Sequence, residues 1–230
     1  MVKNHLKRIT APKTWPIPKR ETVFIVRPQT GAHSMVTGMP ISILLKDVLG
    51  FARITRGVRF LLNTQEVLVN GKRVKRPEAM VGLMDVVAFP ALKASHRILI
   101  DKRNTLHVVP IAGEEAQFLP LKVTRKTALP GGKLQLGLHN GWTIIVPKGG
   151  EKVGSTVIAT FDKKVKHHYP LAEGAFVLVT GGRHVGTVGT LAALKDGKAV
   201  IKTADGETET VVRHLFVLGA QKPAIKLARE

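Results

Sequence analysis

Apolar positions recur every three or four residues in the stretch that begins at residue 41. The recurring set is Ile41, Leu44, Leu45 and Val48. Gly50 follows two residues after Val48, and glycine readily adopts the left-handed conformation that ends helices. The pattern therefore predicts a helix with one buried face that stops at Gly50.

A second helix is predicted from Thr55, which we expect to be its cap. Its inward-facing positions are Val58, Leu61 and Leu62. A short strand at residues 67–69 leads into Asn70-Gly71, the dipeptide best suited to a type I′ hairpin turn. A buried strand at residues 86–89 closes this unit, so two helices and a small sheet are expected.

From residue 93 onward, short apolar runs are separated by Gly-Gly and Asn-Gly pairs, which is typical of β structure. Asn140-Gly141 lies between two alternating runs and predicts a hairpin. This region fits a small barrel or a sandwich, and both remain open. Further along, the repeated glycines of residues 181–189 predict the bends of a tightly curved small barrel.

Residues 1–40 mix prolines with cations. Because proline lacks an N–H and biases its predecessor toward extended conformations, no long helix is expected there. The segment is either a solvated tail or a segment that orders only on RNA. Trp15 and His5 favour RNA, because aromatic rings stack on bases while neighbouring cations contact phosphates.

Together these patterns predict an α+β, multidomain chain with weakly structured ends. The expected parts are a basic N-terminal extension (1–40), a small two-helix/β domain (41–92), a central β-rich domain (93–170), a small C-terminal β-barrel (171–219) and a tail (220–230).

The charge balance favours a polyanionic partner. Lys and Arg total 36 against 16 Asp and Glu, for a formal net charge of +20. Such an imbalance weakens a compact state through self-repulsion. A polyanionic partner compensates for the excess charge, and neutralising its phosphates releases condensed counterions, which favours binding. A membrane surface also attracts cations. However, no apolar run approaches the roughly 20 residues of a membrane span, and no basic helix with an aromatic face is evident.

The cations are concentrated toward the N-terminal part. Residues 1–65 hold eleven basic and two acidic residues. Arg53, Arg56 and Arg59 are spaced by three, with no acid between Asp47 and Glu66 to neutralise them. A charged helix face is often simply solvated. Here the spacing favours phosphate binding, because a guanidinium donates two hydrogen bonds in a planar fork.

Signals for catalysis or metal binding are weak. The chain has no cysteine, which excludes disulfides and thiolate metal sites, and with no signal peptide expected we predict a cytoplasmic protein. His167-His168 has no neighbouring ligand cluster and is not taken as a metal site. Residues 149–156 partly match the motif of a phosphate-binding loop, but Ser155 stands where that motif needs lysine. We expect no catalytic residue, no metal and no cofactor.

Three stretches carry motifs of RNA-binding proteins. Residues 41–89, above all Val69-Asn70-Gly71-Lys72 and the run 81–86, resemble the S-four RNA-binding domain. Residues 173–189 resemble a KOW motif, which implies an SH3-like barrel. With His5-Leu6-Lys7-Arg8 and residues 11–13 ahead of them, their order resembles the S-four-e family of small-subunit ribosomal proteins across nearly the whole chain.

The resemblance implies a non-enzymatic constituent of the small ribosomal subunit that binds its ribosomal RNA and supports assembly. Its implied partners are that RNA and neighbouring ribosomal proteins, with no membrane and no small-molecule substrate. Arg183 and His184 would lie in the KOW loop, facing RNA or protein. The other residues expected to contact RNA are Lys3, His5, Lys7, Arg8, Lys13, Trp15, Lys19, Arg20, Arg53, Arg56, Arg59, Lys72 and Arg73.

Two other classes of protein remain as alternatives. One is an RNA-modifying enzyme, because S-four domains accompany catalytic domains such as pseudouridine synthases. The segments here are too short and too β-rich to supply such a domain. The other is a ribosome-associated or transcription-elongation factor that uses its KOW unit to bind protein. The basic extension argues against it, because permanent burial in RNA explains that extension better.

Overall fold

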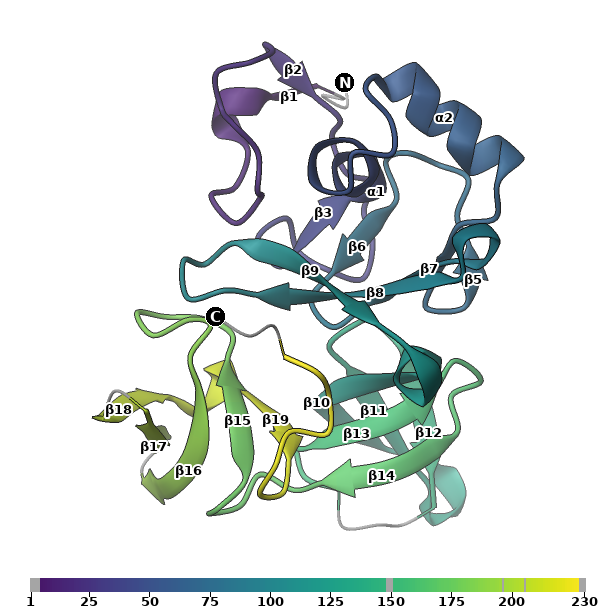
Figure 1. The fold of residues 1–230 in the computed structure, drawn as a ribbon. Coiled ribbons are helices and arrows are strands. Elements are labelled where there is room, and N and C mark those ends of the chain that lie inside the picture. Colours follow the sequence, from purple (N-terminus) through teal and green to yellow (C-terminus); the bar gives the residue numbers. More distant parts are fainter. Residues whose placement is uncertain (1–4, 148–150, 196, 205, 228–230) are drawn as a thin grey trace. The chain divides into compact units, whose positions relative to one another are not determined.

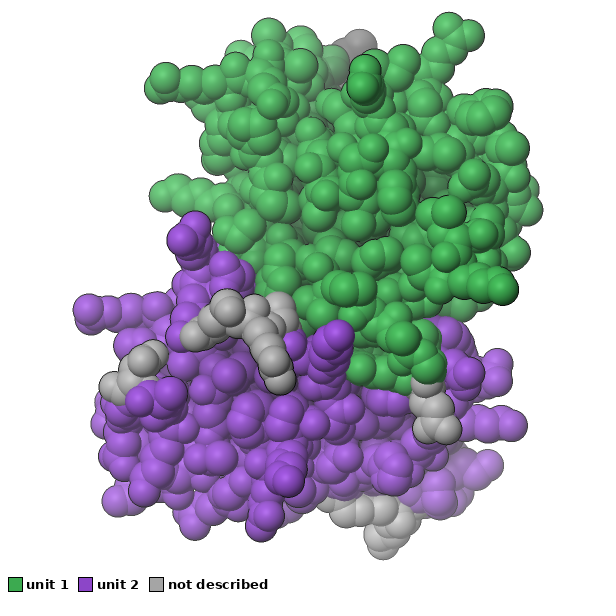
Figure 2. Space-filling model, in the orientation of Figure 1, with its two compact units in different colours: residues 1–99, 105–116 green, residues 100–104, 117–230 purple. Residues whose placement is uncertain are grey.

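The structure is a computed structural model that describes residues 5–147, 151–195, 197–204 and 206–227, the side chain of Glu114 excepted. The chain divides into two compact units (Figures 1 and 2). Unit 1 comprises residues 1–99 and 105–116, and unit 2 comprises residues 100–104 and 117–230. The described residues are mostly β with short helices, so the predicted mixture of α and β holds with the helical part small.

The N-terminal segment of unit 1 is folded, which differs from the expectation that it orders only on RNA. A two-stranded ribbon is formed by β1 (Leu6–Lys7) and β2 (Phe24–Ile25), with the 3₁₀ turn η1 (Arg8–Thr10) after β1. Between the strands, Ala11, Trp15 and Ile17 are buried. Their burial removes apolar surface from water, which stabilises the segment without RNA.

Both predicted helices are present. The first starts as α1 (Ile41–Ile43) and continues as the π-helical turn η2 (Leu44–Val48), and Gly50 follows with φ +68°. The second is α2 (Thr55–Thr64), which buries Val58 and Leu62. The prediction that Thr55 caps α2 is wrong: Ile54 holds the capping position, and no side chain caps the helix there.

Two sheets complete unit 1 (Figure 1). β3 (Gly38–Pro40) pairs with β6 (Met80–Gly82). The second sheet has the order β5-β4-β7-β8-β9. Its strands are β4 (Leu68–Val69), β5 (Lys72–Arg73), β7 (Val86–Phe89), β8 (Ala94–Ile100) and β9 (Leu106–Ile111), and the short turns η3 (Pro90–Leu92) and η4 (Gly113–Gln117) follow β7 and β9.

The turn between β4 and β5 confirms the Asn-Gly prediction. Asn70 has φ +50° and Gly71 has φ +76°. A type I′ turn requires positive φ at both central residues, which asparagine and glycine tolerate best. The turn therefore projects Lys72 and Arg73 from a tight hairpin.

The first sheet of unit 2 is antiparallel with the order β12-β11-β10-β13-β14. Its strands are β10 (Phe118–Ala128), β11 (Leu134–Leu138), β12 (Thr143–Val146), β13 (Thr156–Thr160) and β14 (Val165–Tyr169), with the turn η5 (Pro130–Gly132) after β10. The predicted hairpin at Asn140-Gly141 is confirmed, because β11 pairs with β12. Asn140 Oδ1 accepts a hydrogen bond from the Trp142 N–H at 3.1 Å, which closes the turn.

The second sheet of unit 2 has the order β18-β17-β16-β15-β19, so the first strand of this region pairs with its last. The strands are β15 (Phe176–Val179), β16 (Val188–Lys195), β17 (Lys198–Thr203), β18 (Gly206–Val211) and β19 (Leu215–Gly219), with the turn η6 (Val212–His214) before β19. Its buried core includes Val177, Leu191, Ile201 and Val217.

Candidate nucleic-acid interface

The outward face of α2 carries two of the three predicted arginines. At 100° per residue, Arg56, Arg59 and Phe60 fall within an arc of about 100°, opposite the buried Val58 and Leu62. All three outward side chains are exposed. Arg53 is also exposed, but it lies in the bend before the helix, so only Arg56 and Arg59 of the three evenly spaced arginines share the helix face.

The β4–β5 hairpin adjoins the end of this helix. Arg73 Nη2 donates a hydrogen bond to the backbone carbonyl of Asn63 at 3.2 Å. Lys72 and Arg73 are both exposed. We call Arg56, Arg59, Phe60, Lys72 and Arg73 the helix–hairpin surface. Because four cations from two elements are gathered here, the surface is suited to phosphate groups.

A buried polar network fixes the base of the hairpin. Asn70 Nδ2 donates to Asp85 Oδ1 at 2.7 Å, and Asn70 Oδ1 accepts from the Val86 N–H at 2.9 Å. Asp85 Oδ2 accepts from the Gly82 N–H at 2.8 Å and lies 2.9 Å from His33 Nε2. A Cβ at Gly82 would overlap the His33 ring, so only glycine fits there. The turn is thus held by side chains distant in sequence.

The two ionisable groups of this network hold each other charged. Burial alone lowers the pKa of His33, but the charge and hydrogen bond of Asp85 outweigh burial and leave that pKa above its ordinary value. Burial alone raises the pKa of Asp85, and His33, Asn70 and the Gly82 N–H together bring it below its ordinary value. The pair therefore joins the N-terminal segment to residues 80–89.

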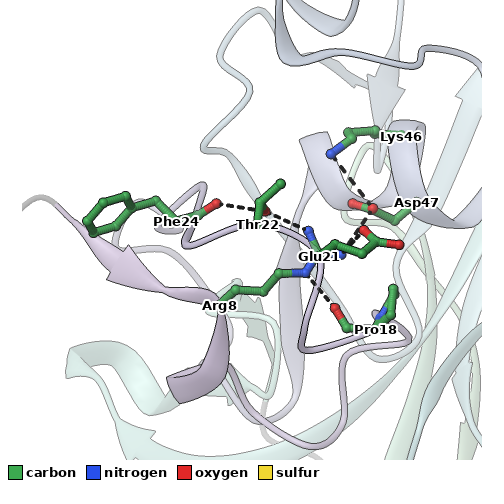
Figure 3. Close-up of polar contacts among 7 residues, drawn as sticks. All are labelled: Arg8, Pro18, Glu21, Thr22, Phe24, Lys46 and Asp47. Atoms are coloured by element: carbon green, nitrogen blue, oxygen red, sulfur yellow. Dashed lines mark hydrogen bonds and ion pairs between the residues drawn. The ribbon is translucent and has the colours of Figure 1, made fainter.

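Arg8 is not available to RNA, which corrects its predicted role. Its side chain is 1% exposed and reaches toward Pro18, Glu21 and Asp47 (Figure 3). Nε donates to the Pro18 carbonyl at 2.5 Å, Nη1 to Thr22 Oγ1 at 3.2 Å and Nη2 to Glu21 Oε2 at 2.9 Å. Asp47 lies 3.6 Å from Nη2. A guanidinium that holds both carboxylates has a structural role.

Trp15 is likewise internal, so its predicted stacking on RNA bases is corrected. The residue is 3% exposed. Its indole Nε1 donates to the carbonyl oxygens of Gly38 at 2.8 Å and Met35 at 3.0 Å. The ring buries apolar area while its N–H is satisfied, as buried tryptophans usually require. Trp15 therefore anchors the segment to β3.

The other predicted residues of the extension stay at the surface, with one exception. His5, Lys7, Lys13 and Arg20 are exposed. Lys19 is half-buried, and its Nζ donates to the Ala11 carbonyl at 2.9 Å. Lys3 lies outside the described residues. Four of the side chains predicted in this segment are therefore accessible to RNA. The other three, Arg8, Trp15 and Lys19, make contacts within the protein.

The loop between β15 and β16 carries the remaining predicted pair. Arg183 is exposed and His184 is half-buried. In the same loop Gly186 has φ +76°, and a Cβ there would overlap the backbone of Asp101. The close approach holds the loop against residues 101–102 of the same unit, so Arg183 projects from a positioned backbone.

One cation that sequence reasoning did not single out, Lys122, is half-buried. Lys122 Nζ donates to the Arg213 carbonyl at 2.6 Å, and burial lowers the pKa of Lys122 to about 8. Burial and the nearby charges of Arg213 and Lys122 also lower the pKa of His214. Lys122 thus ties β10 to the turn before β19.

Across the part of the chain that the structure describes, no group of three or more His, Cys, Asp or Glu side chains is placed to hold a metal ion. None of the described helices is long and apolar enough to cross a membrane.

Comparisons with curated relatives cover nearly the whole chain. The RS4NT (NUC023) domain model matches residues 2–36, and the model of ribosomal family S4e matches residues 92–165. The small ribosomal subunit protein eS4 of Methanocella arvoryzae is 36% identical over 98% of this chain and 98% of its own length. The chain belongs to ribosomal family S4e. The eS4 protein of Methanocaldococcus jannaschii is 32% identical, with 98% of both chains covered.

A solved S4e structure shares the fold. The crystal structure of the 30S ribosomal protein S4e from Thermoplasma acidophilum matches with a TM-score of 0.69 at 27% identity. The match covers 80% of this chain and 96% of that one. The two family models leave residues 37–91 between them, so the helix–hairpin surface lies outside both matched ranges of this S4e chain.

The surface also includes a residue that sequence reasoning missed. Phe60 is 65% exposed beside two arginines. A period of 3.6 residues already places it opposite Val58 and Leu62, so the helical pattern contained the signal. His33 and Asp85 were missed as well, because nothing local in the sequence pairs them.

Proposed function

We propose that this chain is a structural, non-enzymatic constituent of the small ribosomal subunit that binds ribosomal RNA through the helix–hairpin surface and the exposed cations of its N-terminal segment. The observation that carries the proposal is the full-length match to relatives named small ribosomal subunit protein eS4. Its partners would be small-subunit ribosomal RNA and neighbouring ribosomal proteins, and its location the cytoplasmic small subunit.

The helix–hairpin surface supplies the physical basis for RNA binding. Arg56 and Arg59 project from one face of a helix, and Lys72 and Arg73 from a hairpin bonded to its end. Arginines suit phosphates because their donors match two oxygens at once. Phosphate contacts would position the protein, while the shape and unpaired loops of the folded RNA would supply selectivity. The chain would thereby offset phosphate repulsion where RNA helices pack.

The strand order of the last sheet supports the proposal that residues 171–219 form a KOW-type, SH3-like barrel. The order β19-β15-β16-β17-β18 pairs the first strand with the last and sets one helical turn before the final strand. We likewise propose residues 41–92 as an S-four RNA-binding domain and residues 93–170 as the central domain. Arg183 and His184 would then contact RNA or a neighbouring protein from the KOW loop.

The test is the salt dependence of binding to small-subunit ribosomal RNA, measured with the full chain. Each neutralised phosphate contributes about 0.7–0.9 to the slope of log affinity against log salt concentration. Replacing Arg56 and Arg59 together by Gln should therefore lower affinity and make the slope shallower by roughly two such contacts. The matched control replaces the exposed Lys195 and Lys198 by Gln. Equal effects of the two pairs would contradict a localised surface.

A further inference from the structure

The ribbon and the turn after β1 expose three apolar side chains that the fold leaves uncovered. Phe24 is 57% exposed, Val23 68% and Ile9 70%. Lys7 pairs directly with Phe24 across the strands, and the Arg8 N–H continues the pairing by donating to the Val23 carbonyl at 2.9 Å. Adjacent exposed aromatic and aliphatic side chains mark an interaction site more often than isolated ones do.

The exposed ring has a defined setting. Its centroid lies 5.9 Å from that of His5 in an edge-to-face arrangement, which leaves ring surface open to solvent. In Figure 3 the Phe24 ring points away from the Arg8 side chain. Thr22 Oγ1 also donates to the Phe24 carbonyl at 3.2 Å. Because Arg8 holds the residues before Phe24 through Pro18, Thr22 and Glu21, a ligand that stacks on Phe24 meets a preorganised ring and loses little entropy on binding.

A groove lined by Lys7, the cross-strand partner of Phe24, is cationic as well as apolar. It has a volume of about 300 Å³ and is lined by Ile9 and Val23 together with Lys7, Lys19 and Arg20. Among the described residues, no ion-pair partner faces the side chains of Lys7 or Arg20. The one acid of the groove, Glu21, is held by Arg8 at 2.9 Å. The groove thus favours an anionic ligand with an apolar face.

We propose that this face of the ribbon, made of Phe24 and the groove next to its partner Lys7, is a stacking site for an unpaired nucleotide of RNA, with the base on Phe24 and the adjoining phosphates at Lys7 and Arg20. The inference rests on the proposed RNA-binding function and deepens it. RNA is favoured over a protein partner because residues 5–30 hold six basic residues against one acidic residue. An aromatic ring among cations is the arrangement by which proteins bind single strands, whose bases offer an open π face. A duplex keeps its bases stacked and offers only phosphates to this face.

The experiment compares binding of the full chain to a fluorescent single-stranded oligoadenylate and to an RNA duplex, over a range of salt concentrations. Phe24→Ala should weaken oligoadenylate binding roughly tenfold, as expected for the loss of one stacked base. Duplex binding and both salt slopes should stay unchanged, because no phosphate contact is removed. Ile145→Ala, an exposed apolar position of unit 2, is the matched control and should change neither.

A second variant reports on the site itself. Phe24→Trp, placed in a Trp142→Phe background, should restore oligoadenylate affinity, and its fluorescence should be quenched by oligoadenylate but not by duplex. Unchanged oligoadenylate binding by Phe24→Ala would overturn the stacking site and leave RNA binding standing. Failure of the unaltered chain to bind either RNA would overturn the proposed function too. Normal RNA binding by Phe24→Ala with poor incorporation into small subunits would assign the face to a protein partner and overturn the inference.

Discussion

His33 Nε2 lies 2.9 Å from Asp85 Oδ2, so the N-terminal segment is ion-paired to the strand region that also holds the Asn70 turn. Both side chains are nearly inaccessible to water. A buried pair with additional hydrogen bonds is costly to break from one side, because the remaining charge stays buried. The segment, the turn and the helix–hairpin surface are therefore coupled through one carboxylate.

The stability supplied by this pair should depend on pH. The pKa of His33 is raised above 6.5, so its contribution is full below pH 6.5 and is lost as the pH rises through the raised value. The pKa of Asp85 is lowered below 3.8, so its contribution is full above pH 3.8 and is lost as the pH falls through the lowered value. The difference in free energy of unfolding between the unaltered chain and His33→Gln should thus be largest between pH 3.8 and pH 6.5, where both contributions are full.

Urea unfolding across pH measures that difference, with the exposed His5→Gln as the control. Histidines titrate roughly between pH 5 and pH 9. A difference in free energy of unfolding that stays constant over this range would contradict a charged His33–Asp85 pair.

Removing the amide of Asn70 should destabilise the hairpin. Asn70→Ala leaves the Val86 N–H and one Asp85 oxygen without their partner, and alanine tolerates the positive φ at this position poorly. We expect a loss of about 2–3 kcal/mol in the free energy of unfolding. Asn63→Ala, an exposed position of α2, should change it by less than about 0.5 kcal/mol. Similar values for the two variants in urea titrations would argue against the network.

The N-terminal segment should resist proteolysis in the absence of RNA until its internal anchor is removed. Arg8→Ala deprives the Pro18 carbonyl, Glu21 and Asp47 of their shared donor, and we expect trypsin to cleave near Lys13 and Lys19 much faster as a result. Arg20→Ala removes an exposed cation and is expected to leave the cleavage rate of these sites nearly unchanged. Rapid cleavage of the unaltered free chain at these lysines would restore the interpretation that the segment orders only on RNA.

Trp15 should be insensitive to RNA. The chain contains two tryptophans, so Trp142→Phe leaves Trp15 as the single tryptophan. Because its ring is buried and its N–H is bonded within the protein, its emission should be protected from a soluble quencher, and oligoadenylate should not change it. Quenching by oligoadenylate in this variant would show that Trp15 reaches a base after all.

Elements with local causes could be predicted from the sequence, and those with distant partners could not. The Asn70-Gly71 turn follows from the φ values that these two residues tolerate, and the buried Val58 and Leu62 follow from helical spacing. Arg8 and Trp15 look like tail residues among cations, and their burial depends on partners remote in sequence, such as Asp47 and Gly38.

The same limit applied to the candidate interface. Counting charges located the basic region, but it did not separate the exposed Arg56 and Arg59 from the internal Arg8. It also selected Trp15, which is buried, and passed over Phe24 and Phe60, which are exposed. Exposure is decided by tertiary packing, which composition and periodicity describe only in part.

The most direct test of the central claim is sedimentation of a cell extract through a gradient, with this protein quantified against other small-subunit proteins as salt rises. The account predicts one copy per small subunit, retained through a high-salt wash, because a protein buried among RNA helices exchanges its many phosphate contacts slowly. Substoichiometric protein, or protein that washes off at moderate salt, would contradict it and indicate a transient ribosome-associated or elongation factor.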